Sequence, residues 1–192
     1  MTRAYSGEEA VDRILITRDA IAQRVAEIGR SISREHAGSE VRLVTVLRGG
    51  LFFLCDLCRH VELPLTVDFM AISSYAGGSG GAVRITKDLD DPIEDARVIV
   101  VEDIIDTGLT LNYILSVLRQ RSPASLEVCT LLDKDVRRIV DLPIAYRGFS
   151  VPDAFLVGYG LDLDGRLRNL PYVATVRHEA AEPGRSLVES AQ

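Results

Sequence analysis

Long apolar runs separated by polar turns predict a sheet whose strands are covered on both faces. Residues 98–101 are four consecutive β-branched residues with no polar alternation. Such runs are typical of parallel strands packed between helices, and residues 41–47 and 126–132 are expected to form similar strands. Further extended segments are predicted at 65–73, 83–88, near Ala145 and at 155–160.

Helical spacing appears between these strands. Ile21, Val25 and Ile28 recur on one face of the segment 6–34, which we expect to be helical, and residues 51–59 and 111–120 are predicted helices as well. Strands that alternate with helices predict an α/β fold, with a mainly parallel twisted sheet flanked by helices.

The length and composition of the chain favour one globular domain. The 192 residues show no internal repeat and no break in composition before Glu182. We therefore expect a single domain over residues 1–181, a mobile loop at 73–82 and a loose tail at 182–192.

Charge and hydropathy narrow the classes of partner. The net charge of −6 argues against a nucleic-acid partner. No apolar run approaches the roughly 18 residues that span a membrane, and the polar N-terminus lacks the apolar core of a signal peptide. We expect no membrane partner and a cytoplasmic location. Cys55 and Cys58 form a lone C-x-x-C, which we interpret as buried structural cysteines.

The strand at 98–101 ends in carboxylates. Glu102 and Asp103 follow it directly, and Asp106 begins the turn Asp106-Thr107-Gly108-Leu109-Thr110 before the helix at 111–120. Open α/β sheets bind ligands at the carboxyl ends of their strands. The unpaired N–H groups at a helix N-terminus attract phosphate.

The residue types of this turn suit a phosphorylated sugar. Gly108 permits close approach of the backbone, and Thr107 and Thr110 offer hydroxyl donors. Glu102 and Asp103 would repel phosphate, so they are expected to hold sugar hydroxyls, a Mg²⁺ ion or a proton. A phosphorylated ribose carries all of these groups, although the turn taken alone also fits a simple helix cap.

Two glycine-rich segments suggest further contacts with a ligand. Arg48-Gly49-Gly50 lies between a strand and a helix and predicts a second anion-binding turn. The loop at 73–82 has four glycines in the five positions 77–81. We expect it to act as a lid whose Ser73, Ser74 and Tyr75 contact the ligand, and a hairpin tip or linker is the alternative.

Four motifs in order resemble those of the purine phosphoribosyltransferases, in particular the branch that uses hypoxanthine and guanine. They are VLRGG, SSYAGG, VVEDIIDTGLTL and FLVGYGLDLDGRLRN, within residues 6–176. The resemblance implies the type I fold with a small hood formed by N- and C-terminal segments. It also implies Mg²⁺-dependent transfer of ribose 5-phosphate from phosphoribosyl pyrophosphate to N9 of hypoxanthine or guanine, by a homodimer or homotetramer.

The resemblance assigns roles at the acidic strand end and the glycine turn. Glu102 and Asp103 would hold the ribose hydroxyls and Mg²⁺, residues 106–110 would bind the 5-phosphate, and Asp106 would exchange a proton with purine N7. Arg48 and Gly49 would bind pyrophosphate, in a turn where relatives have a non-proline cis peptide.

The resemblance also implies a purine pocket. Lys134 would donate to the 6-oxo group, Phe155 would stack on the base, and the backbone of Leu156 would read its amide edge. Asp162 would lie near the purine and hold a second Mg²⁺, while Arg168 would grip pyrophosphate. Without the resemblance, we would place Phe155 in the core and Lys134, Asp162 and Arg168 on the surface, with Lys134 paired to Asp133 or Asp135.

Two other functions stay open from the sequence. A regulator that senses phosphoribosyl pyrophosphate could use the same cradle and bind RNA or a protein. An enzyme for another base is the second alternative, since xanthine differs from the expected purines at the 2-position and adenine lacks the 6-oxo group.

Overall fold

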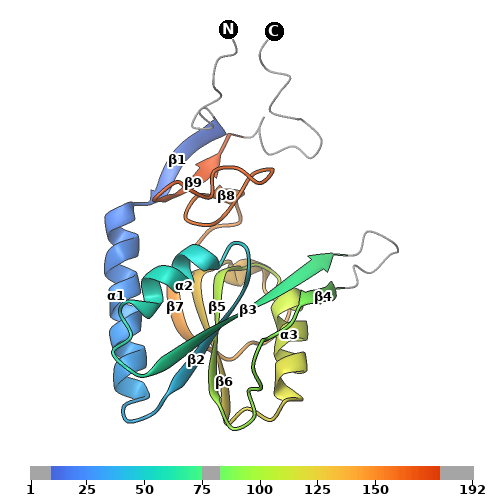
Figure 1. Ribbon diagram of the computed structural model, residues 1–192. Coiled ribbons are helices and arrows are strands. Elements are labelled where there is room, and N and C mark those ends of the chain that lie inside the picture. The colour runs from blue at the N-terminus through green and yellow to red at the C-terminus, as the bar shows by residue number, and fades with distance from the viewer. Residues whose placement is uncertain (1–9, 75–82, 178–192) are drawn as a thin grey trace, which may run out of the picture.

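The computed structural model describes residues 10–74 and 83–177, which form two sheets (Figure 1). The larger sheet contains β2 (Val41–Leu47), β3 (Leu65–Ser74), β4 (Val83–Lys87), β5 (Arg97–Ile105), β6 (Ser125–Asp133) and β7 (Ile144–Ser150). Their order is β4-β3-β2-β5-β6-β7, and every neighbouring pair is parallel except β3 with β4. The predicted, mainly parallel α/β sheet is confirmed.

Helices cover both faces of this sheet. α1 (Arg18–Glu35) and α2 (Leu51–Cys58) lie on one face and α3 (Leu109–Arg119) on the other, as Figure 1 shows. Successive residues of a strand point to opposite faces, so Ile99 and Val101 pack in the core with α1 and α2, while Val98 and Val100 pack in the core with α3. This double burial explains why residues 98–101 show no polar alternation. Among the described helices, none is long and apolar enough to cross a membrane.

A second, smaller sheet forms the hood of the molecule. It contains β1 (Val11–Ile16), β8 (Leu156–Val157) and β9 (Val173–Val176), in the order β1-β9-β8 with antiparallel pairing. The expected hood from both ends of the chain is therefore confirmed. The helical prediction for residues 6–34 is wrong over β1, because that segment pairs with a strand distant in sequence.

Parts of the predicted lid and tail lie outside the described residues. Ser73 and Ser74 belong to β3, where Ser73 pairs with Arg84 of β4. Tyr75 and residues 76–82 fall outside the description, as does the tail at 182–192. The lid and the loose tail stay predictions.

The cysteines of α2 do not behave as expected. Phe53, Leu54 and Leu57 form the buried face of this short helix. Cys55 is exposed and Cys58 is partly buried, so the predicted burial of both is wrong; only Cys129, on β6, is buried. All three are free thiols.

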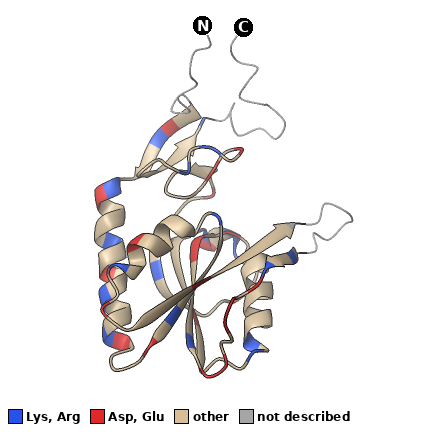
Figure 2. Ribbon diagram, in the orientation of Figure 1, with Lys and Arg blue, Asp and Glu red and all other residues tan. Residues whose placement is uncertain are grey.

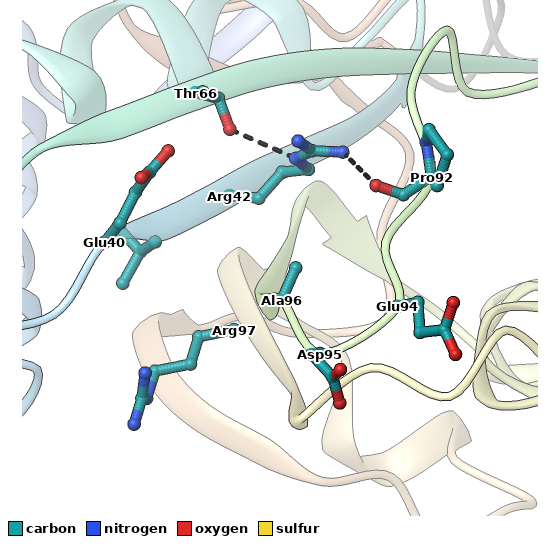
Figure 3. A pocket seen from close by; sticks show the side chains of 9 residues that line it. Glu40, Arg42, Thr66, Pro92, Glu94, Asp95, Ala96 and Arg97 are labelled. Atoms are coloured by element: carbon teal, nitrogen blue, oxygen red, sulfur yellow. Dashed lines mark hydrogen bonds between the residues drawn. The ribbon is translucent and has the colours of Figure 1, made fainter.

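One hollow lies at the amino ends of β2 and β5, where the strands begin (Figure 3). Its Arg42 is already engaged, since Nη1 donates to the Pro92 carbonyl (2.7 Å) and Nε to the Thr66 hydroxyl (3.1 Å). Figure 2 shows acidic residues along the adjoining connection between β4 and β5. Arg42 therefore ties this connection to the sheet, on the side away from the acidic strand end.

Candidate active site

The carboxyl end of β5 supplies acids to two separate parts of one site. Glu102 lines a hollow together with Asp106, Thr107 and residues of the α3 N-terminus. Asp103 lies instead against the turn after β2, because a Cβ added at Gly49 would be 1.7 Å from Asp103 Oδ2. Any side chain at position 49 would displace this carboxylate, which explains the glycine.

The surroundings of the two acids disfavour their charged forms. Burial raises the pKa of Glu102 well above its ordinary value, and the neighbouring Asp103 raises it further. Burial also raises the pKa of Asp103, although its Oδ1 accepts a hydrogen bond from the Ile104 N–H (2.9 Å). A cation or sugar hydroxyls at this point would stabilise the ionised forms of these two partly buried acids.

The donor set fits a magnesium ion that is completed by substrate. Within residues 10–74 and 83–177, no group of three or more His, Cys, Asp and Glu residues forms a ready metal cage. Asp162 is engaged by Arg168 Nη2 (2.5 Å) and by the Gly165 N–H (2.8 Å). Mg²⁺ commonly takes one or two carboxylates plus water and substrate phosphates, so Glu102 and Asp103 suit it without a closed cage.

The start of α3 is open to an anion. Its N-cap is Gly108, with a φ of 81°, and no side chain of the described residues caps it by hydrogen bonding. The Leu109 N–H reaches only the Thr107 hydroxyl, at 3.4 Å. Asp106 does not cap this helix, so the simple helix-cap alternative is wrong for it, and Gly108, Thr110 and Leu111 of the helix start line the hollow.

The turn after β2 packs under the hood. The Leu47–Arg48 peptide is cis, and the Arg48 side chain is exposed. A Cβ at Gly160, in the hood, would lie 2.2 Å from the Gly49 carbonyl oxygen. Arg168 Nη1 donates to the Gly160 carbonyl (2.5 Å), which brings a guanidinium and the Arg48 turn into one region.

Lys134 is buried rather than solvated. Its residue is 8% exposed, and Nζ lies 3.6 Å from Asp153 Oδ1. Pairing with Asp133 is wrong, because Asp133 is fully buried and pairs with Arg138 and Arg147. A buried lysine beside a half-exposed carboxylate is available to a ligand that brings its own acceptor.

Phe155 and Leu156 separate at the start of β8. Phe155 precedes the strand and is 46% exposed, so its assignment to the core is wrong, whereas Leu156 is 6% exposed. An exposed aromatic ring offers a stacking surface, and an adjacent strand offers backbone polar groups.

Three residues at the site were missed from the sequence. Ile104 lines the hollow beside Glu102 and Asp106. Arg137 Nε lies 3.0 Å from Asp106 Oδ1, and its Nη1 donates to Asp153 Oδ1 (3.1 Å). Arg137 lies three residues after Lys134 in a charged run, which was the only available signal.

Comparison with known proteins identifies the family of this chain. A family model described as a phosphoribosyl transferase domain matches residues 12–164. The chain belongs to the phosphoribosyltransferase family. Hypoxanthine phosphoribosyltransferase of Salmonella typhimurium is 49% identical to this phosphoribosyltransferase over 167 residues, which cover 85% of this chain and 94% of that protein.

Other relatives are similar to this chain in sequence or structure over most of their length. Hypoxanthine-guanine phosphoribosyltransferase of Mycobacterium avium is 44% identical over 180 residues, covering 90% of this chain and 88% of that protein. The structure of the Staphylococcus aureus hypoxanthine phosphoribosyltransferase matches with a TM-score of 0.88 at 38% identity, over 93% of this chain and 98% of that one. The Trypanosoma cruzi enzyme, solved with its product IMP, matches with a TM-score of 0.84 at 36% identity, over 92% and 98% of the chains.

Proposed function

We propose that this phosphoribosyltransferase transfers the 5-phosphoribosyl group of phosphoribosyl pyrophosphate to N9 of hypoxanthine or guanine, giving IMP or GMP and pyrophosphate in purine salvage. The observation that carries the proposal is the end of β5, where two partly buried acids lie between an open helix N-terminus and the turn at Gly49. The named activities of relatives at 41–49% identity support it.

Phosphoribosyl pyrophosphate is held at its two ends. The N–H groups of residues 107–110 and the threonine hydroxyls bind the 5-phosphate, and Glu102 and Asp103 bind the ribose hydroxyls. The Arg48–Gly49 turn and Arg168 bind pyrophosphate as its negative charge develops. Glu102, Asp103 and Asp162 would hold Mg²⁺, which supplies charge neutralisation at the leaving group.

The purine enters beside the phosphoribosyl group. Lys134 donates to the 6-oxo oxygen, Phe155 stacks on the ring, and the Leu156 backbone contacts the amide edge. The burial of Lys134 and the exposure of Phe155 support these roles. Adenine has no 6-oxo acceptor for the lysine, so we expect poor use of adenine.

Initial-rate assays with hypoxanthine, guanine, xanthine and adenine test this proposal. We expect turnover of the 6-oxopurines. This turnover should require phosphoribosyl pyrophosphate and should be lost when a chelator removes Mg²⁺. RNA capture in a filter-binding assay without purine turnover would favour the regulator alternative. Sedimentation of the same sample tests the expected homodimer or homotetramer, and cell fractionation tests the cytoplasmic location.

The base role of Asp106 has its own test. Asp106→Asn keeps the shape and polarity of the side chain but cannot take the N7 proton, so turnover is expected to fall about 10²-fold while binding of phosphoribosyl pyrophosphate persists. Steady-state rates and ligand titration measure the two effects. Glu94→Gln, in the remote hollow, is the control; unchanged turnover in Asp106→Asn would remove the base assignment.

A further inference from the structure

A chain of four charged groups joins the two residues proposed to contact the purine edge. Asp106 Oδ1 lies 3.0 Å from Arg137 Nε, and Arg137 Nη1 donates to Asp153 Oδ1 at 3.1 Å. The same Asp153 oxygen is 3.6 Å from Lys134 Nζ. Asp106 is thus linked to Lys134 through the side chains of Arg137 and Asp153.

The backbone fixes Arg137 relative to this chain. Arg137 ends the short 3-10 helix η2 (Asp135–Arg137), and its N–H donates to the Lys134 carbonyl (2.9 Å). Two residues later, the Ile139 N–H donates to the Thr107 carbonyl (3.1 Å), which ties this segment to the phosphate-binding turn. A shift of η2 would therefore move Arg137 against Asp106.

Arg137 covers only one oxygen of the proposed base. Asp106 Oδ1 is shielded from solvent and has no well-aligned hydrogen-bond donor, although 46% of the side chain is exposed. The exposed area therefore belongs to the rest of the side chain, and Asp106 lines the same hollow as Glu102. The contact with Arg137 orients the group and leaves its other oxygen for a ligand.

Asp153 balances the charge of Arg137. Its pKa is lowered mainly by the hydrogen bond from Arg137, and also by the charges of Arg137 and Lys134. Two acids and two cations make the chain neutral as a whole. Arg137 therefore forms ion pairs with both Asp153 and Asp106, and Asp106 is not its sole counter-charge.

We propose that Arg137 is a positioning residue that orients the Asp106 carboxylate toward purine N7 and, through Asp153, keeps Lys134 at the adjacent 6-oxo position. The inference rests on the proposed function, in which Asp106 and Lys134 contact neighbouring atoms of one purine edge. Arg137 itself does not touch the reacting atoms.

Arg137→Met removes the charge and the donors while it keeps much of the side-chain volume. Because misplacement of a catalytic group slows the chemical step, kcat with hypoxanthine is expected to fall ~10-fold, and the KM for hypoxanthine to rise a few-fold. The KM for phosphoribosyl pyrophosphate is expected to stay within about twofold, since the phosphate contacts lie on other residues. Arg137→Lys should restore part of kcat by returning one charged donor.

Arg119→Met is the matched control, because Arg119 is exposed at the end of α3. Thermal unfolding of every variant reports on folding, and Arg137 is 45% exposed, so its truncation leaves little cavity. Asp153→Asn provides a second route to the same effect: it should raise the KM for hypoxanthine by freeing both Arg137 and Lys134. Wild-type constants in both Arg137→Met and Asp153→Asn would overturn the inference.

A double-mutant comparison separates this inference from the proposed function. If Arg137 acts through Asp106, Arg137→Met added to Asp106→Asn causes no further fall in kcat. If Arg137→Met lowers kcat by the same factor in Asp106→Asn as in the wild-type protein, the positioning role of Arg137 is overturned. The role of Asp106 as the base would not be affected by that result. Wild-type turnover in Asp106→Asn alone would instead remove the base assignment, and this inference with it.

Discussion

Glu102 of the candidate site lowers the stability of the folded, ligand-free protein. Burial and the adjacent Asp103 raise its pKa in the folded state above the ordinary value of 4.5. A carboxyl with a raised folded pKa binds its proton more tightly when folded, so stability falls as the pH rises from the unfolded pKa toward the folded one. At neutral pH the ligand-free protein carries this penalty, which bound ribose and a cation would relieve.

Glu102→Gln is therefore expected to stabilise the ligand-free protein at neutral pH, by roughly 1 kcal/mol, because the amide need not ionise. The gain should shrink as the pH is lowered toward 4.5. Urea unfolding with a chelator across this range measures it, and exposed Glu94→Gln is the control. A stability difference that is independent of pH would contradict the charge explanation. The same variant should bind phosphoribosyl pyrophosphate more weakly.

The junction of α1 with β7 shows how one helix protects an edge of the sheet. β7 is an edge strand, whose outer carbonyls lack a partner strand. Arg24 of α1 donates through Nη2 to the Arg147 carbonyl (2.6 Å) and through Nε to the Gly148 carbonyl (3.2 Å). Because β1 ends one residue before the N-cap of α1, Thr17, the helix also sets the position of the hood.

Arg24→Met should lower the free energy of unfolding by about 1–2 kcal/mol, since it leaves two edge carbonyls without these donors. Urea unfolding measures the change. Arg30→Met, exposed on the same helix, is the matched control for helix propensity and charge. Equal losses in the two variants would show that the edge contacts contribute nothing beyond the helix itself.

Hydrophobic patterns in consecutive residues correctly predicted the strands and helices that depend on local sequence alone. The β-branched run at 98–101 and the helical spacing at 111–120 gave β5 and α3, since their burial pattern is written in consecutive residues. β1 and β9 depend on pairing between segments more than 150 residues apart, and no local periodicity encodes that. Arg137 and Asp153 were missed for the same reason, because only the fold brings them to Asp106.

The hood and the larger sheet meet at the turn after β2, which is proposed to bind pyrophosphate. Gly160 packs on the Gly49 carbonyl, and the Tyr159 hydroxyl donates to Asp56 of α2 (2.8 Å). Asp162 and Arg168 reach the site from the hood, whereas Asp103 reaches it from β5. The spacing between the two sheets therefore determines whether the proposed pyrophosphate contacts form together.

Gly160→Ala tests this dependence of the site on hood placement. Gly160 has a φ of 101°, and the added Cβ would lie 2.2 Å from the Gly49 oxygen, so the hood must move away from the turn. We expect kcat/KM for phosphoribosyl pyrophosphate to fall ~10-fold or more, with a smaller change in the KM for hypoxanthine. Gly165→Ala is the matched control, since its φ of 79° imposes similar backbone strain but its Cβ would meet nothing within 4 Å. Equal losses of activity in the two variants would assign the effect to local strain and not to contact between hood and turn.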